Sequence, residues 1–226
     1  MDIQLHTTIK GNGEILILLH GNDEDSTFFV HQLDYFSSKY KVIAIDTRGH
    51  GQSPRGNKPF TIRQFVNDLH DYLDENNLTK VNLLGFSDGG NIALLFAIQY
   101  PNYVNKLIVD GANLNPKGVL FRYQFITDIQ YYYNKLVHPN SRQTEMLRLM
   151  VVDPNIDPKD LQLINIPTLV MAGTHDGILE SHTRFIASCI KNAKLSIIEG
   201  DHFIAYKNYA VFNKVVDEFL QNNKNN

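Results

Sequence analysis

Six short apolar runs alternate with helical patterns along the chain, and this alternation is the feature that most constrains the fold. The runs are rich in Val, Ile and Leu, which is typical of strands buried on both faces. We expect strands at residues 15–19, 42–45, 81–84, 106–109, 168–171 and 195–198. Alternating strands and helices predict an α/β fold, a mostly parallel central sheet with helices on both faces.

Three segments between and after these runs carry apolar side chains at the spacing of a helix, at residues 62–73, 91–97 and 211–220. Thr61 is positioned to cap the first of them through its hydroxyl. Pro101 is expected to end the second near Tyr100, because a proline lacks the N–H that a continuing helix needs. Before the first strand, the turn at residues 11–13 contains Asn-Gly and predicts a hairpin between an N-terminal extended segment and that strand.

The alternation breaks between about residues 113 and 165, where aromatic residues and prolines are frequent. We interpret this stretch as a small helical cap inserted into one domain that spans residues 1–226, lying over the carboxyl edge of the sheet. The alternative is that it packs at the side as extra helices. Ligands of open α/β sheets bind at the carboxyl ends of the strands, so an aromatic insertion there would line the pocket.

Charge and composition exclude several classes of protein. A net charge of −3 argues against a nucleic-acid partner, and no apolar run approaches the ~20 residues needed to span a membrane. Cys189 is the only cysteine, so no internal disulfide can form, and its place in a helical pattern favours a buried thiol over a nucleophile. Without a signal peptide, the chain is predicted to be cytoplasmic and to act on a small molecule; the sequence does not fix its oligomeric state.

The segment Gly85-Phe86-Ser87-Asp88-Gly89 joins the third strand to the next helix and has the pattern G-x-S-x-G. A serine on so tight a turn points its hydroxyl out of the sheet, and the glycines let the backbone pass. Backbone N–H groups at the start of the helix then face any negative charge that develops nearby. Ser87 is therefore the candidate nucleophile.

A serine hydroxyl needs a base and an orienting carboxylate to become a good nucleophile. Of nine histidines, His202 follows the last predicted strand on a loop at the same edge as Ser87. Two aspartates also follow strands, Asp110 and Asp176. We favour Asp176, whose loop is more polar and which gives the chain order Ser, Asp, His expected on an α/β sheet. Asp110 remains the rival.

Two backbone N–H groups are candidates to bind an oxyanion. One belongs to Asp88, directly after the nucleophile, and the other to Asn22, in the loop after the first buried strand. Gly21 permits close approach of that loop. We interpret the His20 side chain as structural, holding the loop by hydrogen bonds.

The chain resembles the α/β-hydrolase fold superfamily over most of its length. The matching pieces, in the family's order, are His20-Gly21-Asn22, Asp46-Thr47-Arg48-Gly49-His50-Gly51-Gln52-Ser53, Gly85-Phe86-Ser87-Asp88-Gly89-Gly90, Gly173-Thr174-His175-Asp176 and Gly200-Asp201-His202-Phe203. The resemblance implies that Ser87 is the nucleophile, Asp176 the acid and His202 the base. It also implies that the loop at residues 46–53 is structural rather than catalytic.

The residue at the turn separates subgroups of this family. Haloalkane dehalogenases and epoxide hydrolases need an aspartate there, so Ser87 favours acyl transfer. The sequence Gly-x-Ser-Asp-Gly-Gly resembles valacyclovirase-type hydrolases, which accept amino-acid esters. Asp88 would then meet a substrate amine, although a carboxylate at a helix N-terminus is also explained by simple electrostatic capping. Asp88 and Phe86 are the candidate substrate-binding residues.

These observations predict a serine hydrolase that cleaves a small carboxylic ester or thioester through an acyl-enzyme. Its chemistry needs no cofactor, and no spacing of His and Asp residues suggests a metal site. Two alternatives remain: a carbon–carbon bond hydrolase of a diketone-like acid with the same three residues, and a receptor-like ligand-binding member with little turnover. Perhydrolysis without a cofactor is a conceivable side activity.

Overall fold

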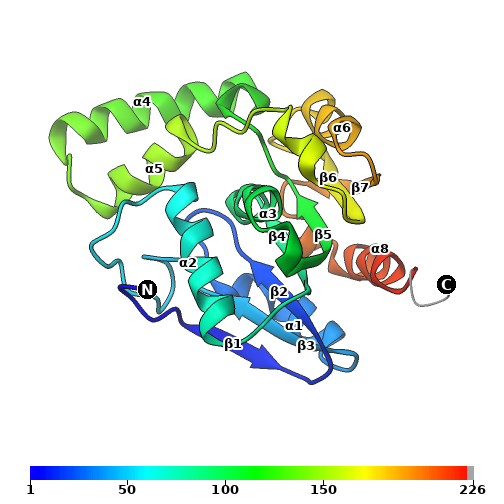
Figure 1. Cartoon of the computed structure of the whole chain (residues 1–226). Coiled ribbons are helices and arrows are strands. Elements are labelled where there is room, and N and C mark those ends of the chain that lie inside the picture. Colours follow the sequence, from blue (N-terminus) through cyan, green and yellow to red (C-terminus); the bar gives the residue numbers. More distant parts are fainter. Residues whose placement is uncertain (223–226) are drawn as a thin grey trace.

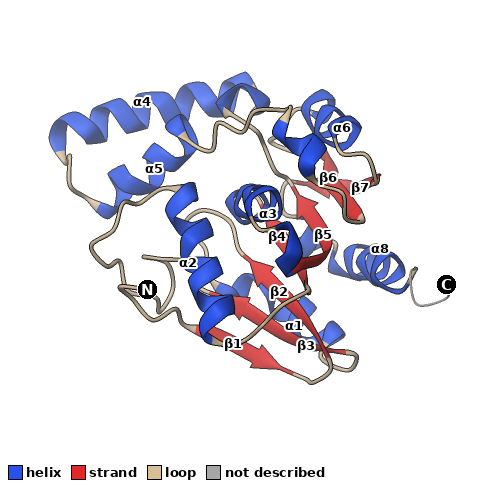
Figure 2. Cartoon of the chain, in the orientation of Figure 1, coloured by secondary structure: helices blue, strands red, loops and turns tan. Residues whose placement is uncertain are grey.

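The computed structural model describes residues 1–222, which form a seven-stranded sheet between two layers of helices (Figure 1 and Figure 2). The strands are β1 (Thr7–Lys10), β2 (Glu14–Leu19), β3 (Tyr40–Ile45), β4 (Val81–Phe86), β5 (Val104–Asp110), β6 (Thr168–His175) and β7 (Ala193–Asp201). Their order across the sheet is β1-β3-β2-β4-β5-β6-β7. All six strands predicted from the apolar runs are present, and each is longer than predicted by one to five residues.

Pairing at the N-terminal edge differs from the prediction. β1 pairs with β3 in antiparallel fashion, whereas every other pair is parallel. The predicted hairpin between β1 and β2 is therefore wrong, although Gly11 and Gly13 do take the positive φ angles of a turn. The reason is that β2 is a buried central strand whose two edges are filled by β3 and β4. The N-terminal segment can join the sheet only at its outer edge.

Helices cover both faces of this sheet. They are α1 (Val30–Phe36), α2 (Ile62–Glu75), α3 (Asp88–Gln99), α4 (Phe121–Val137), α5 (Arg142–Val152), α6 (Glu180–Cys189), α7 (Ile204–Lys207) and α8 (Tyr209–Gln221). α2, α3 and α6 share one apolar core with the sheet, and α1, α7 and α8 share the other. Alternate residues of each central strand feed the two cores, as Leu83 and Leu84 do from β4.

The helix limits follow the local signals. Thr61 caps α2 by accepting a hydrogen bond from the N–H of Gln64 at 3.2 Å. α3 ends at Gln99, directly before Tyr100 and Pro101, as predicted. The single cysteine, Cys189, ends α6 and is only partly buried, because it packs at the margin of one core rather than inside it. No helix among residues 1–222 is long and apolar enough to cross a membrane.

Helices α4 and α5 occupy the stretch between β5 and β6 that interrupts the alternation. Figure 1 shows both of them on one side of the sheet, beyond α2 and α3. Met146 and Leu149 of α5 belong to the same apolar core as α2 and α3. This stretch therefore shares a core with the sheet, and α4 is held mainly through α5 and the loops at its two ends.

The loop at residues 46–53 braces the carboxyl edge of the sheet. Asp46 accepts hydrogen bonds from the N–H groups of Ser26 and Gln52, at 2.7 and 2.9 Å. Arg48 is completely buried and donates two hydrogen bonds of 2.7 Å to the carboxylate of Asp68 on α2. These contacts give a physical basis for the structural role that family resemblance implied for the loop.

Replacing Asp68 with Ala should lower the free energy of unfolding by about 1.5–3 kcal/mol, because the buried Arg48 cation would lose one of its two carboxylate partners and keep only Asp2. Urea unfolding measures this change. The control is Glu180→Gln, which breaks the exposed ion pair with Arg184 and should cost under about 1 kcal/mol. Similar losses in the two variants would contradict the structural role of Arg48.

Candidate active site

Ser87 lies between β4 and α3 in a backbone conformation that L-residues rarely adopt, with φ 53° and ψ −118°. The turn is possible because Gly89 allows helix α3 to approach the end of β2. A Cβ on Gly89 would lie 2.0 Å from the carbonyl oxygen of Leu19. The N–H of Ser87 donates to the carbonyl of Asp110 at 2.8 Å, which anchors the turn to β5.

The three residues singled out from the strand ends meet in space. The distance from Ser87 Oγ to His202 Nε2 is 3.1 Å, and that from His202 Nδ1 to Asp176 Oδ1 is 2.6 Å. A carboxylate can only accept, so Nδ1 carries the proton and Nε2 is free to accept from the serine hydroxyl. Asp176 also accepts from the N–H groups of Ile178, at 2.8 Å, and Gly173, at 3.3 Å.

Burial opposes a positive charge on His202, but the hydrogen bond and the charge of Asp176 outweigh it and raise the pKa of the imidazole. Gly111 makes room for the ring, since a Cβ there would lie 2.7 Å from His202 Cε1. The arrangement therefore favours an imidazole that gains a proton readily.

Asp110, the rival acid, is placed differently. Its side chain is completely buried, and neither carboxyl oxygen has a hydrogen-bond partner among the described residues. Burial and the nearby charge of Asp176 raise its pKa well above the ordinary value. The N–H donors at this edge go to Asp176, whereas no described donor faces the Asp110 carboxyl.

The loop after β2 lies against Ser87. A Cβ on Gly21 would be 3.1 Å from the Cβ of Ser87, so only glycine permits this approach. As predicted, His20 holds the loop: its Nδ1 donates to the carbonyl of Gly21 at 2.7 Å, and its Nε2 accepts from the N–H of Thr47 at 3.0 Å. The Asn22 side chain donates to the carbonyl of Met146 on α5 at 2.9 Å.

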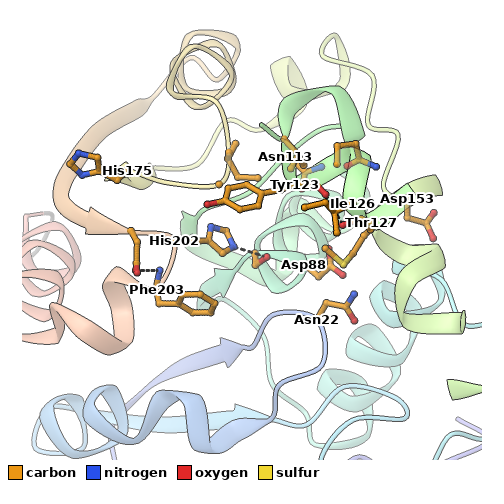
Figure 3. A pocket seen from close by; sticks show the side chains of 17 residues that line it. Asn22, Asp88, Asn113, Tyr123, Ile126, Thr127, Asp153, His175, His202 and Phe203 are labelled. Atoms are coloured by element: carbon orange, nitrogen blue, oxygen red, sulfur yellow. Dashed lines mark hydrogen bonds between the residues drawn. The ribbon is translucent and has the colours of Figure 1, made fainter. Parts of the chain in front are cut away.

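A cavity of about 420 Å³ opens above Ser87 and is lined by residues of the sheet edge, α4 and α5. Figure 3 shows Asp88, Asn113, Tyr123 and His202 facing this common space, with Asn22 at its lower rim. Asp88 and Asp153 are two of the carboxylates that line it, and no Lys or Arg lines it among the described residues. The cavity is therefore acidic on its inner wall.

The two candidate substrate-binding residues have different surroundings. Asp88 lines the cavity; its Oδ1 accepts from the Asn91 amide at 3.2 Å, whereas its buried Oδ2 has no described partner. Burial, with the nearby charge of Asp153, raises the pKa of Asp88 to about 6. Phe86 is instead buried, stacked on Phe28 at 4.5 Å between ring centroids, and it touches only the edge of a second cavity.

That second cavity, of about 470 Å³, lies on the other side of Ser87 and also borders His202. Glu24 is on its wall and accepts a hydrogen bond from the N–H of Gly21 at 3.0 Å. Burial raises the pKa of Glu24 to about 7. Ser87 and His202 therefore border both cavities.

Comparison with known proteins agrees with this architecture. The profile of the alpha/beta hydrolase fold matches residues 14–145. The chain belongs to the α/β-hydrolase fold family. Serine hydrolase BPHL of Homo sapiens is 30% identical, over 97% of this chain and 84% of the relative. For 3-oxoadipate enol-lactonase 2 of Acinetobacter baylyi the identity is 25%, over 97% and 94%. The solved enol-lactonase of Burkholderia xenovorans has a TM-score of 0.80 at 20% identity and covers 97% of each chain.

Three residues at the site of this α/β-hydrolase family member were not identified from the sequence. They are Glu24, Gly111 and Asp153. Glu24 had a local signal, because a carboxylate three residues after Gly21 can fold back onto its N–H. Gly111 directly follows a strand-end aspartate, which is a place where backbone often approaches a side chain. Asp153 had no signal, since only the packing of α5 against the sheet brings it to the cavity.

The raised pKa of Asp110 predicts a pH-dependent stability difference. Because its folded pKa is raised, wild-type stability falls as the pH rises from about 4 toward that pKa, by up to ~1.4 kcal/mol per pH unit. Asp110→Asn lacks this titration, so its stability relative to wild type should improve over the same range in urea unfolding. Asp34→Asn is the control: Lys10 lowers the pKa of Asp34, so this group titrates below about pH 4 and its difference from wild type should stay constant over the same range. A pH-independent difference for Asp110→Asn would contradict the assignment.

Proposed function

We propose that this hydrolase-family member is a serine hydrolase that cleaves a small carboxylic ester or thioester through an acyl-enzyme. The observation that carries the proposal is the chain of contacts from Ser87 Oγ through His202 to Asp176, at 3.1 and 2.6 Å. A hydroxyl, an imidazole with a defined tautomer and a carboxylate in this order are what acyl transfer requires.

In the proposed cycle, His202 Nε2 takes the proton of Ser87 as Oγ forms a bond to the carbonyl carbon. The backbone N–H groups of Asn22 and Asp88 hold the oxygen that gains the negative charge. The imidazolium then gives its proton to the leaving oxygen or sulfur as that bond breaks. Water, deprotonated by the same nitrogen, attacks the acyl-enzyme; the products are a carboxylic acid and free Ser87.

The charge of the first cavity narrows the substrate class. Asp88 and Asp153 lie on its wall. Two arginines act on Asp153 alone: Arg148, whose Nη1 is 3.7 Å from Asp153 Oδ2, and Arg63. The diketone-like acid of the carbon–carbon hydrolase alternative carries a carboxylate, which the carboxylates of this wall would repel. The charge of the cavity therefore disfavours that alternative. A neutral acyl group, or one with an amine beside the carbonyl, fits this charge. The resemblance to valacyclovirase-type hydrolases supports the amine.

We also propose that residues 113–165 act as a cap on a single domain. The support is that α4 and α5 contribute Tyr123, Thr127 and Met150 to the cavity above Ser87. A cap of this kind sets the shape of the acyl site and shields the acyl-enzyme from bulk water.

A fluorophosphonate probe should label wild-type protein at Ser87, because the activated hydroxyl attacks phosphorus as it would a carbonyl carbon. Ser87→Ala should abolish labelling and ester turnover, and His202→Ala should reduce kcat by roughly 10⁶-fold. Asp176→Asn should reduce it by roughly 10⁴-fold, since the wrong imidazole tautomer is then favoured. Intact and peptide mass spectrometry locate the label.

Ser141→Ala is a matched control, because Ser141 only caps α5 and should leave labelling unchanged. Unlabelled wild-type protein that binds an ester without turnover would refute the hydrolase and favour the receptor-like alternative.

Asp88→Asn tests the substrate amine while keeping the backbone N–H at this position. We expect kcat/KM for phenyl alaninate to fall by roughly 10–100-fold, since a hydrogen bond to a charged group contributes about 1.5–3 kcal/mol. For phenyl propanoate, which differs only by the amine, the loss should be much smaller. An equal loss on both esters would leave Asp88 with the helix-capping role alone.

The pH dependence gives a second test of Asp88. With a pKa of about 6, Asp88 is ionised above that pH and neutral below it. The wild-type preference for phenyl alaninate over phenyl propanoate should therefore decrease as the pH falls through 6. In Asp88→Asn the ratio should not change over this range.

A further inference from the structure

Helix α4 has its polar side toward the protein and its apolar side toward solvent. The inward residues, which are buried or half-buried, are Gln124, Thr127, Asp128, Tyr131 and Asn134. Their polar groups are satisfied close by: the Gln124 amide donates to Asp128 at 2.8 Å, and the Thr127 hydroxyl donates to the carbonyl of Tyr123 at 3.0 Å. Gln124 and Thr127 also line the cavity, which explains why the inward side is polar.

The outward side of α4 is unlike that of a helix facing water. Its residues Phe125, Ile129, Tyr132, Tyr133 and Leu136 leave between 52% and 83% of their surfaces exposed. Phe121 and Val137 extend this surface at the two ends of the helix. A helix packed on a globular protein normally turns its apolar stripe inward. Here nothing among residues 1–222 covers that stripe.

We propose that the outward face of α4 is the interface of a homodimer, in which it pairs with the same face of a second copy of the chain. The proposal concerns assembly and holds whatever substrate the site cleaves.

The exposed area is what such a dimer needs. With roughly 200 Å² for a large apolar side chain, these residues expose on the order of 900 Å² per copy. A monomer rarely exposes a contiguous apolar patch of more than a few hundred Å². A standard interface buries about 800 Å² per partner, so one α4 face per copy is sufficient.

The spacing of the apolar residues suits a helix as the partner. Phe125, Ile129, Tyr132 and Leu136 follow one another at intervals of four, three and four, which is the seam along which two helices interlock. A two-fold axis beside Ile129 pairs this seam with itself, as a symmetric dimer requires.

The charges on the face argue against a lipid surface as the occupant. Arg122 is the only cation on the outward side, and its guanidinium already donates to the Tyr123 hydroxyl at 3.1 Å. Lys135 is drawn over the ring of Tyr131, 5.5 Å from its centroid, on the inward side. Anionic membranes hold peripheral helices through several cations at about 1 kcal/mol each, and the chain as a whole carries −3.

Pairing would also affect the site. Tyr123, Ile126 and Thr127 of α4 line the cavity above Ser87, and α4 contacts the rest of the protein mainly through α5. A second copy on the outer side would fix the helix that forms this wall.

Sedimentation velocity of the full chain across a micromolar concentration series tests the proposal. We expect wild type to sediment as a dimer, and the double variant Ile129→Lys with Leu136→Lys to dissociate at least ~100-fold more readily, since Ile129 lies inside the seam and Leu136 is its most exposed residue. The control is Val211→Lys on α8, an exposed apolar position on another helix, which should stay dimeric. Far-UV circular dichroism checks that all variants fold.

Hydroxyl-radical footprinting of the wild type adds a measurement that needs no variant. Tyr132 and Tyr133 should become protected as the concentration rises, whereas Tyr209 on α8 should not. A monomer at every concentration, or a dimer that the two lysines leave intact, would overturn the proposal. So would a monomer that binds phosphatidylglycerol vesicles, because lipid would then be the occupant.

Discussion

The tight passage from β4 to α3 is the constraint on which the rest of the site depends. Ser87 can hold its strained conformation because the residues two positions before and after it are glycines: a Cβ on Gly85 would lie 2.1 Å from the carbonyl oxygen of Gly89. The short turn brings the N-terminus of α3 up to the end of β2. The nucleophile, the Asp88 N–H and the loop that contains Asn22 are thereby brought together by one piece of backbone.

The carboxyl groups around His202 differ in the number of hydrogen-bond donors that face them. Asp176 accepts hydrogen bonds from two N–H groups and the imidazole, so both of its oxygens face donors. Asp110 has no side-chain partner among the described residues, and burial raises its pKa; Glu24, with one N–H donor, has a pKa of about 7. Similar side chains thus have different surroundings, and Asp176 is the one that meets the imidazole at Nδ1.

The sequence was sufficient to predict the central strands, the helix limits and the edge of the sheet at which the site forms. Parallel strands place their carboxyl ends together, so Ser87, Asp176 and His202 could be grouped without coordinates. The pairing of β1 could not be predicted from the local turn signal. That signal does not reveal that both edges of β2 are occupied by β3 and β4. The inverted orientation of α4 also depends on tertiary context: its stripe of Phe125, Ile129, Tyr132 and Leu136 would ordinarily predict a buried face.

The central claim is that Ser87 carries the acyl group during turnover, and rapid-quench mass spectrometry during hydrolysis of a slowly deacylating aryl ester tests it most directly. The account predicts a transient adduct with the mass of the acyl group on the peptide that contains Ser87, formed in step with a burst of released phenol equal to the enzyme concentration. Full turnover with no adduct at any quench time, or an adduct on another residue such as Cys189, would contradict it.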